Sequence, residues 1–289
     1  MRDAWALYHR SVEILVAGAG RLGLQLAAAV AGAGGTVRGV LSRNPSARHH
    51  PGAGGPVLGW EAAPGVLDTP LIVLAVPDDA IPATARRLAS FGPLDGRTVL
   101  HTSGLHTSDA LAACREAGAA VGSWHPLGTF PPLELGRARW RGLWTAVEGD
   151  PAAVEAARAL SRRLGCRPWR IDPARKARYH AAAAVAANLT HVLAATAVRE
   201  AAAAGLPHPG EALAPLVLAS CRAALDHPGM EALTGPLARG DAGTIRRHLE
   251  SLPPPLADAY RAVAALLTAG TPPAPPDPRD PRDPPPERD

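Results

Sequence analysis

Lysine is nearly absent from this sequence. Lys176 is the only lysine among 30 lysines and arginines, so every other such side chain is an arginine. A position that keeps lysine in such a chain indicates a need for a compact ammonium group that can lose its proton, although a surface lysine that survived by chance is the alternative. The arginines are scattered and the formal net charge is only +4, so the charge pattern does not indicate a nucleic-acid-binding protein.

Cysteine is also scarce. Cys114, Cys166 and Cys221 are odd in number, far apart and in no metal-ligand spacing, so we expect free thiols in a reducing cytoplasm. We expect no membrane-spanning helix, on the reading that arginine interrupts every alanine-rich run, and no signal peptide, because the charged residues 1–10 lack an apolar core. The 11 histidines form no familiar ligand spacing, which predicts that the chain holds no metal.

A glycine-rich turn near the start of the chain is the most informative motif. Residues 18–23 read G-x-G-x-x-G between an apolar strand, residues 13–17, and an alanine-rich helix. In this setting Gly18 permits a tight turn, Gly20 lets a pyrophosphate approach the backbone, and Gly23 lets the helix pack closely on the strand. The motif predicts a dinucleotide site, and the alternative is an ordinary turn in a glycine-rich chain.

The end of the second strand indicates which dinucleotide binds. The position about 20 residues beyond the motif holds Asp or Glu in NAD-binding proteins, but here it is Ser42, followed by Arg43. A carboxylate would repel a 2′-phosphate, whereas a hydroxyl and a guanidinium attract it. We therefore predict NADP(H), with NAD as the alternative if Arg43 is an ordinary surface arginine. The predicted cofactor-binding residues are Gly18, Gly20, Arg21, Leu22, Gly23, Ser42, Arg43, Asn44, Val76, Pro77 and Asp78.

Apolar strands alternate with helices in the first half of the chain. The continuous apolar run at residues 70–76 suits a parallel strand that is covered on both faces. The alternation predicts an α/β fold with a Rossmann-type, doubly wound parallel sheet, in which ligands bind beyond the carboxyl ends of the strands. The predicted strands are residues 13–17, 36–41, 70–76, 97–101, 120–124 and 143–147.

The pattern becomes helical after Asp150. We predict one further helix and a short strand, and then a long helix over residues 174–204 that is capped by Asp172. Four more helices follow, at residues 211–226, 230–237, 242–251 and 256–269. The predicted domains are an NADP-binding Rossmann domain at residues 1–150, a helical substrate and dimerisation domain at 151–270, and a disordered proline-rich tail at 271–289.

Both halves supply candidate catalytic residues. Ser103 and His125 lie just beyond two predicted strands, where a hydroxyl or an imidazole could bind a substrate carboxylate or carbonyl. Lys176, His180 and Asn188 lie on one side of an otherwise alanine-rich helix, which predicts that they line a cleft. The alternatives are structural residues at the strand ends and an exposed polar stripe on the helix.

Taken together, these motifs resemble a bacterial family that joins a Rossmann-like N-terminal domain to a helical C-terminal domain of unassigned function. The fold of the family is similar to pyrroline-5-carboxylate reductases, β-hydroxyacid dehydrogenases and ketopantoate reductases. In the allied dehydrogenases a lysine and an asparagine of the long helix serve catalysis, which implies such roles for Lys176 and Asn188, although their separation is wider here. The resemblance covers residues 12–269 and rests on residues 18–23, 42–44, 74–79, 101–104, 123–127, 147–150 and 176–180.

The resemblance implies an NADPH-dependent oxidoreductase that reduces a small 2-oxo acid, similar to the ketopantoate reductases of pantothenate biosynthesis. Lys176 or His180 would supply the proton while Asn188 polarises the carbonyl. Two alternatives stay open: an imine reductase of the pyrroline-5-carboxylate type, and a non-catalytic NADP-binding sensor or regulator. By analogy we also expect a homodimer that binds a small-molecule substrate. From the cysteines, charge and composition we expect a cytoplasmic protein that binds neither nucleic acid nor membrane.

Overall fold

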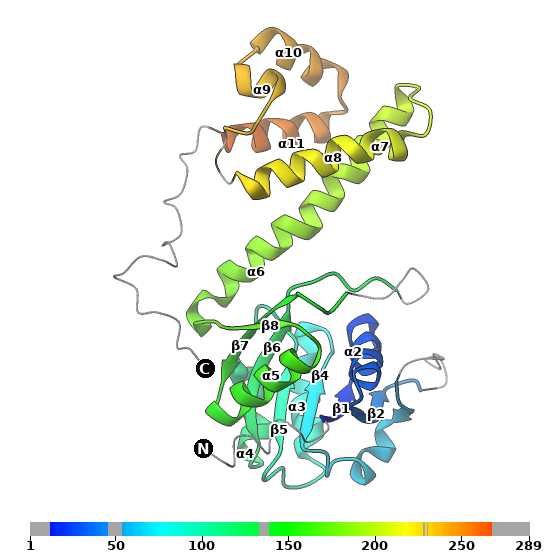
Figure 1. Ribbon diagram of the computed structural model, residues 1–289, viewed down its shortest axis with the longest axis vertical. Helices are drawn as coiled ribbons and strands as arrows, with labels where there is room; N and C mark the ends of the chain where they lie inside the picture. Colours follow the sequence, from blue (N-terminus) through cyan, green and yellow to red (C-terminus); the bar gives the residue numbers. More distant parts are fainter. Residues whose placement is uncertain (1–11, 46–53, 133–138, 228, 230, 268–289) are drawn as a thin grey trace. The chain divides into compact units, whose positions relative to one another are not determined.

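The chain divides into two compact units, Met1–Thr190 and His191–Asp289. The computed structural model describes residues 12–45, 54–132, 139–227, 229 and 231–267. Within the described residues the first unit is α/β and the second is helical (Figure 1). The α/β class and the helical C-terminal region that the sequence predicts are therefore confirmed, whereas the predicted tail at residues 271–289 lies outside the described residues.

An eight-stranded sheet forms the first unit, in the order β3-β2-β1-β4-β5-β6-β7-β8. Every neighbouring pair is parallel except β6 and β7, which are antiparallel. A parallel neighbour needs a crossover, usually a helix, and the described residues between β6 and β7 contain no helix, so β7 returns along β6. The strands are β1 (Glu13–Ala17), β2 (Thr36–Ser42), β3 (Val57–Gly59), β4 (Leu71–Leu74), β5 (Thr98–His101), β6 (Ala120–Pro126), β7 (Trp144–Gly149) and β8 (Arg167–Arg170).

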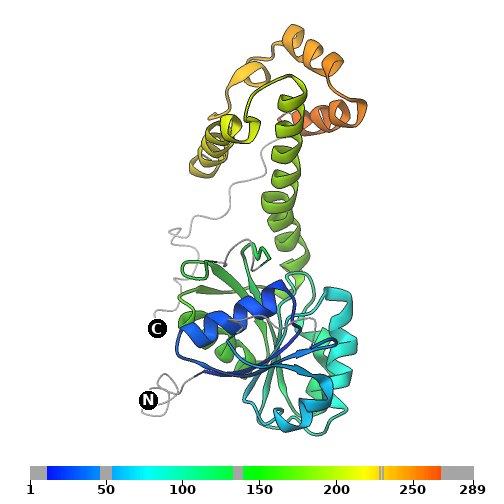
Figure 2. The same ribbon diagram turned by 90° about the vertical axis from the view of Figure 1, so that its right-hand side faces the viewer.

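Two hydrophobic clusters pack on opposite faces of this sheet. One face is covered by α2 (Arg21–Gly32) and α5 (Pro151–Arg163), and the other by the short η2 turn (Trp60–Gly65), α3 (Ile81–Ala89) and α4 (Ala112–Glu116). Figure 2 shows α2 and α3 on the two sides of the sheet. This double coverage explains why the central strand β4 is apolar and buried at every position.

The sheet continues past Asp150, where the sequence predicts the domain boundary. Helix α5 covers the sheet and β8 pairs with β7 in parallel, and the first unit ends only at Thr190. Strand β3 is not among the strands that the sequence predicts. It was missed because it is only three residues long and begins among glycines and prolines, which favour turns.

A long helical run begins at Asp172, whose carboxylate Oδ1 accepts a hydrogen bond from the backbone N–H of Ala174 at 2.9 Å, as expected for a helix cap. The run is not one uniform α-helix, because a π-helical turn separates its two α-helical parts. Such turns are rare and occur frequently at functional sites. The run comprises η6 (Pro173–Arg175), α6 (Lys176–Ala184), η7 (Val185–Leu189) and α7 (Thr190–Ala203).

The expectation that arginine interrupts every apolar run is wrong for this helix. No lysine, arginine, aspartate or glutamate lies between Arg178 and Arg199. By length and composition the helix Pro173–Ala203 could cross a membrane, with a mean hydropathy of 1.6 in its most apolar window, none of which is buried in the chain. A helix that packs its apolar surface against another protein chain has the same pattern.

The second unit is helical throughout its described residues. In it α10 packs against both α9 and α11. Asp241 caps α10, because its Oδ1 accepts a hydrogen bond from the N–H of Thr244 at 3.0 Å. The predicted helix at 230–237 instead begins at Gly235, where Pro236 favours a first turn. The helices after α7 are α8 (Pro209–Asp226), α9 (Gly235–Arg239), α10 (Ala242–Ser251) and α11 (Pro254–Ala265).

Candidate functional site

The glycine turn between β1 and α2 is built so tightly that two of its positions exclude a side chain. Gly18 has a φ of +122°, and a Cβ there would collide with the carbonyl of Ala75. A Cβ on Gly23 would collide with the carbonyl of Gly18, because α2 packs directly on the turn. The geometry is therefore the one that a G-x-G-x-x-G motif requires.

Gly20 differs from these two glycines because space surrounds it. The nearest atom to a Cβ at Gly20 would be the carbonyl oxygen of Ala75, 4.0 Å away. Gly20 is also the N-cap of α2, and no side chain caps this helix end. The first backbone N–H groups of a helix have no partner within it, so this end of α2 can bind an anion such as a pyrophosphate.

A cavity of about 480 Å³, here called the glycine-loop cavity, opens at this turn. Among the described residues that line it there are two guanidinium groups and no carboxylate, so it favours an anionic ligand. Of the predicted cofactor-binding residues, Gly18, Gly20, Ser42, Arg43, Asn44, Val76 and Pro77 line it, whereas Arg21, Leu22, Gly23 and Asp78 do not. The other lining residues are Ala19, Leu41, Trp60, Ala75, Ala80, Ala83, Thr84 and Arg87.

Asp78 connects this cavity to the end of the next strand. Its carboxylate Oδ2 accepts a hydrogen bond from the hydroxyl of Ser103 at 2.8 Å. The same hydroxyl oxygen accepts hydrogen bonds from the backbone N–H groups of Leu105 and His106, at 3.1 and 3.0 Å. Ser103 is thus a buried anchor of the turn after β5 and does not line the glycine-loop cavity.

Gly104, the residue after this anchor, lies against two histidine rings. A Cβ on Gly104 would lie 2.9 Å from Nε2 of His125 and would also collide with Nδ1 of His180. The two rings are 5.6 Å apart and perpendicular. The buried Nδ1 of His180 has no hydrogen-bond partner among the described residues. An imidazole that is close to a strand end and unsatisfied is suited to contact a ligand.

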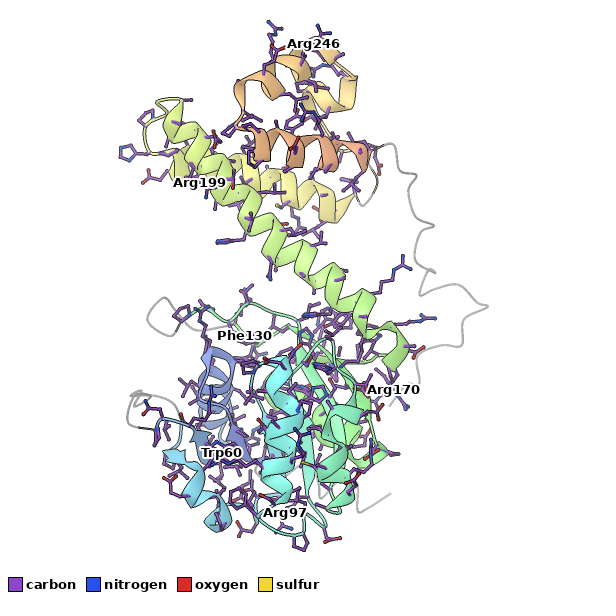
Figure 3. The ribbon with its side chains drawn as sticks, turned by 180° about the vertical axis from the view of Figure 1, so that it is seen from behind. Trp60, Arg97, Phe130, Arg170, Arg199 and Arg246 are labelled. Atoms are coloured by element: carbon purple, nitrogen blue, oxygen red, sulfur yellow. The ribbon has the colours of Figure 1, made fainter. Side chains whose placement is uncertain are left out.

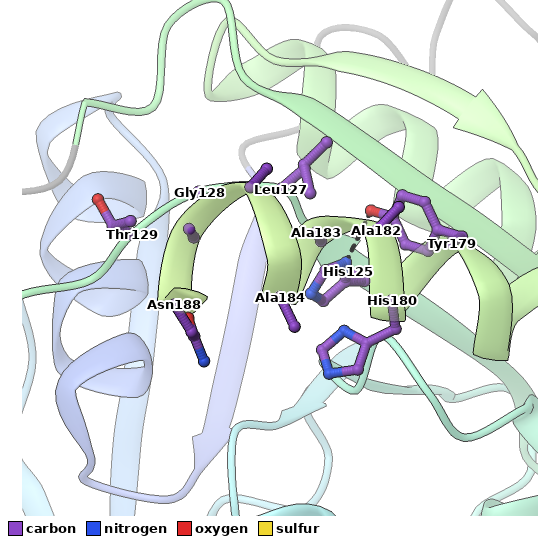
Figure 4. Close-up of a pocket in the computed structure, with 12 residues that line it drawn as sticks. His125, Leu127, Gly128, Thr129, Tyr179, His180, Ala182, Ala183, Ala184 and Asn188 are labelled. Carbon is purple, nitrogen blue, oxygen red and sulfur yellow. Dashed lines mark hydrogen bonds between the residues drawn. The ribbon is translucent and has the colours of Figure 1, made fainter. Parts of the chain in front are cut away.

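These histidines belong to a second cavity of about 490 Å³, here called the histidine cavity (Figure 4). The end of β6 and the residues after it form one wall, and α6 with the π-helical turn η7 forms the other. Most of the helical wall is alanine, which leaves room and gives an apolar surface. The lining residues are His125, Leu127, Gly128, Thr129, Tyr179, His180, Ala182, Ala183, Ala184, Ala186, Ala187 and Asn188.

Tyr179 and His125 form the polar centre of the histidine cavity. The hydroxyl of Tyr179 and Nδ1 of His125 are hydrogen-bonded at 2.8 Å. Burial lowers the pKa of His125 to about 4, assisted by the neighbouring His180 and Lys176, so its imidazole is neutral at pH 7. Burial raises the pKa of Tyr179 to about 12, so its phenol keeps its proton. The pair can therefore donate a proton and accept a hydrogen bond at neutral pH.

Lys176 lies behind this wall rather than in it. Its side chain is 1% exposed, and its Nζ donates to Ser123 Oγ at 2.5 Å and to the carbonyl of Ser103 at 3.3 Å. Its Nζ also lies 3.6 Å from the carboxylate of Glu148, which accepts two further hydrogen bonds from Ser108. Burial lowers the pKa of Lys176, and the carboxylate of Glu148 opposes that effect. The ammonium group thus ties the ends of β5, β6 and β7 to the start of α6.

The structure therefore brings together only part of the predicted catalytic set. His125, His180 and Asn188 line the histidine cavity, whereas Ser103 and Lys176 support the turn beside it. Sequence reasoning did not include Tyr179 in the set, although its position next to His180 on the same helix was a usable signal. It also missed Glu148, whose pairing with Lys176 depends on the long-range register of β7. In the part of the chain that the structure describes, no group of three histidine, cysteine, aspartate or glutamate side chains could hold a metal ion.

Two family models match most of the chain. Residues 6–126 match the Rossmann-like domain, and residues 143–266 match the domain of unknown function DUF2520. No curated protein matches the sequence significantly.

Several solved structures share the fold. A protein of Bacteroides fragilis designated as an NADP oxidoreductase has a TM-score of 0.78 and 19% identity, over 90% of this chain and 99% of that chain. The imine reductase of a Pseudomonas species has a TM-score of 0.61 and 18% identity, over 90% of this chain and 94% of that chain. A reductive aminase from Aspergillus terreus, in complex with NADPH and ethyl-5-oxohexanoate, has a TM-score of 0.61 and 17% identity. The match covers 90% of this chain and 94% of that chain. At these identities the likeness concerns the fold.

Proposed function

We propose that this chain, which joins a Rossmann-like domain to a domain of the DUF2520 family, is an oxidoreductase that uses NADPH to reduce a C=O or C=N bond of a small molecule. One observation carries the proposal: a chain of contacts joins the two cavities. Asp78, next to the lining residue Pro77, binds Ser103, and Gly104 then lies against His125 and His180. A dinucleotide that extends from the glycine turn along Val76 and Pro77 would bring its reactive ring toward the histidine cavity.

The glycine-loop cavity fits NADPH in three respects. The turn is tight at Gly18 and open at Gly20, which suits a pyrophosphate against the backbone. The end of β2 offers Ser42 and Arg43 where an acidic residue would favour NAD, and no carboxylate lines the cavity among the described residues. The solved structures named above include a protein designated as an NADP oxidoreductase and a reductive aminase in complex with NADPH, which supports the same cofactor here.

Bound NADPH would supply a hydride to the carbon of the C=O or C=N bond, and the heteroatom would then need a proton. Tyr179 is the candidate donor, because its phenol is protonated at neutral pH and lies in the cavity. His125, with a proton on Nδ1, would donate the hydrogen bond at 2.8 Å to the oxygen of that hydroxyl and so stabilise the phenolate that proton transfer leaves. The Asn188 amide and the unsatisfied His180 Nδ1 are candidate groups for orienting the substrate. Lys176 and Ser103 are proposed as positioning residues, since they hold the turn that carries Gly104.

The lining of the histidine cavity favours a neutral substrate over a 2-oxo acid. No arginine or lysine is among the described residues that line it, and burial keeps His125 uncharged. A substrate carboxylate buried there would lack the positive partner that a buried anion requires. Of the two substrate classes, the imine or neutral ketone is therefore our proposal, and the imine reductase and reductive aminase of the same fold support it. A ketopantoate-type acid is the competing class.

The active form is proposed to be a homodimer. The most apolar window of the helix Pro173–Ala203 has no buried residues in the single chain, and Val185 and Leu189 are both more than half exposed. In the second unit Leu216, Leu218 and Leu225 are exposed as well. Apolar surface of this extent favours association with another chain, and a second copy is the simplest partner. The three cysteines are free thiols, which agrees with the proposed cytoplasmic location.

Consumption of NADPH by the purified protein tests this function. The substrates would be 2-methyl-1-pyrroline as a neutral imine, cyclohexanone with methylamine, pyrroline-5-carboxylate and ketopantoate, with NADH in parallel. We expect the highest kcat/KM with a neutral substrate and NADPH. A preference for ketopantoate would overturn the proposed substrate class, and tight NADPH binding without turnover on any substrate would favour the non-catalytic sensor.

A further inference from the structure

The outer wall of the glycine-loop cavity is one face of α3 and the turn before it. Ala80, Ala83, Thr84 and Arg87 line the cavity, with the i, i+3, i+4, i+7 spacing of residues that share a helix face. Three of these side chains are small. Arg87 is the only charged group that this face brings to the cavity, and the sequence motifs did not select it.

Arg87 is held over the ring of Trp60. The carbon of its guanidinium lies 4.6 Å from the indole centroid, a cation–π contact. Trp60 is 6% exposed and stacks on Phe91 with a centroid distance of 6.3 Å, so the surface under the guanidinium is fixed by the core. Figure 3 labels Trp60 among the elements of the first unit. A guanidinium held over an aromatic ring by a cation–π contact still has N–H donors that can bind an anion.

The register of the sheet brings this arginine to the same end of the cavity as Arg43. Strand β2 ends at Ser42, and its partner in the parallel strand β3 is Gly59. Arg43 directly follows β2 and Trp60 directly follows β3, so they leave neighbouring strands at the same edge. Arg87 lies on Trp60, and both arginines line one cavity.

Within the described residues, neither arginine at this end is part of an ion pair, and the carboxylate of Glu61 lies against Gly59 instead. Among the described residues, neither the Arg43 nor the Arg87 guanidinium has a hydrogen-bond or ion-pair partner, and no carboxylate lines the cavity. Arg38, by contrast, pairs with both Glu13 and Asp68. Two unpaired guanidinium groups at one end of a cavity suit a ligand with a doubly charged group such as a phosphate monoester.

We propose that Arg87 is a specificity-determining residue that binds the 2′-phosphate of the nucleotide together with Arg43, with Trp60 as the platform that orients it. This inference rests on the proposed use of NADPH, which it deepens by assigning a residue outside the glycine motif and the end of β2. It gives Trp60 a positioning role, because its ring acts through the guanidinium.

Arg87→Gln tests the inference, with Arg86→Gln as a matched control. Arg86 is the preceding residue of α3, is also exposed and does not line the cavity. Dissociation constants would be measured by calorimetry for NADPH, NADH, adenosine 2′,5′-bisphosphate and 5′-AMP. We expect Arg87→Gln to raise the dissociation constants of NADPH and the bisphosphate by about tenfold or more, which corresponds to the loss of one charge-assisted hydrogen bond. The dissociation constants of NADH and AMP should change by less than about twofold. The dissociation constant of Arg87→Lys for NADPH should lie between those of the wild type and Arg87→Gln, because lysine keeps the charge but lacks the planar guanidinium.

The inference would be overturned if Arg87→Gln lost the same affinity for NADPH as for NADH, or if it bound NADPH with wild-type affinity. It would also be overturned if Arg86→Gln lost as much affinity for NADPH as Arg87→Gln, because the effect would then come from the net charge rather than from a specific contact. Failure of the proposed function has a different signature: turnover would be absent on every substrate while the 2′-phosphate preference and its dependence on Arg87 persist. A wild-type protein that binds neither dinucleotide would overturn both.

Discussion

The phenol of Tyr179 and the imidazole of His125 lie 2.8 Å apart, although 54 residues separate them along the chain. Tyr179 belongs to the first turns of α6, and His125 lies near the end of β6. The T-shaped packing of the two rings, with centroids 5.5 Å apart, fixes their mutual orientation. A phenol that keeps its proton at neutral pH and the imidazole that orients it are thereby assembled from two elements at the edge of one cavity.

Tyr179→Phe is expected to remove the proton donor and retain the shape of the cavity. The turnover number should fall by about 10²-fold or more, the usual range for general acid catalysis, with little change in the dissociation constant of NADPH. Tyr260→Phe is the matched control, because Tyr260 forms a similar pair with His248 at 3.4 Å on the helical unit. Stopped-flow measurement of hydride transfer checks the result, and full activity in Tyr179→Phe would assign the proton to another group.

Gly20→Ala should separate folding from nucleotide binding. The backbone of Gly20 is extended, with a φ of −79°, and a Cβ there meets no atom closer than 4.0 Å, so the variant should fold normally. The added methyl group would stand between the pyrophosphate and the start of α2, so NADPH affinity should fall by about tenfold or more. Gly32→Ala, at the other end of α2 with open space around it, should bind NADPH normally. Unchanged affinity in Gly20→Ala would contradict the assignment of the turn.

Lys176→Met should destabilise the fold far more than an ordinary loss of a salt bridge. It would leave the buried carboxylate of Glu148 without its cation, at a cost of about 3–5 kcal/mol in the free energy of unfolding. Adding Glu148→Gln should restore much of that loss, because the uncompensated charge is removed. Arg158→Met, which breaks the exposed pair with Glu155, should cost less than about 1 kcal/mol. Urea unfolding measures all four proteins, and a stable Lys176→Met variant would rule out the bridging role.

His101 should make stability depend on pH below neutrality. Its ring is fully buried, bonded to the carbonyl of Thr107, and burial lowers its pKa from 6.5 to about 4. Above pH 6.5 both folded and unfolded forms are neutral, and between about 6.5 and 4 only the unfolded form gains a proton. His101 alone should therefore lower the free energy of unfolding with decreasing pH in that window, by about 1.4 kcal/mol per pH unit, and His125 should add a similar contribution. His101→Gln should lower this slope by about 1.4 kcal/mol per pH unit, which corresponds to one proton. Unfolding experiments at several pH values check this, and an unchanged slope would contradict the assignment.

Local patterns in the sequence predicted the sheet well and the long-range contacts poorly. Strand β1 and helix α10 have the predicted bounds, because apolar periodicity and caps are local signals. The antiparallel β7 was not predicted, since pairing direction depends on the connection rather than on the strand itself. For the same reason Glu148 and Trp60 were not foreseen, as their partners lie on other elements. His125 and His180 were selected because strand ends and helix faces can be located from sequence.

The burial of Lys176 also has a practical consequence. The protein has a single side-chain amine, and it is enclosed by Ser103, Ser123 and Glu148 with 1% of its side chain exposed. Acylating reagents that label surface lysines in most proteins would find no ε-amino target in the native state. Labelling at this one position would therefore require the first unit to open, so its rate would report how often the ends of β5, β6 and β7 separate from α6.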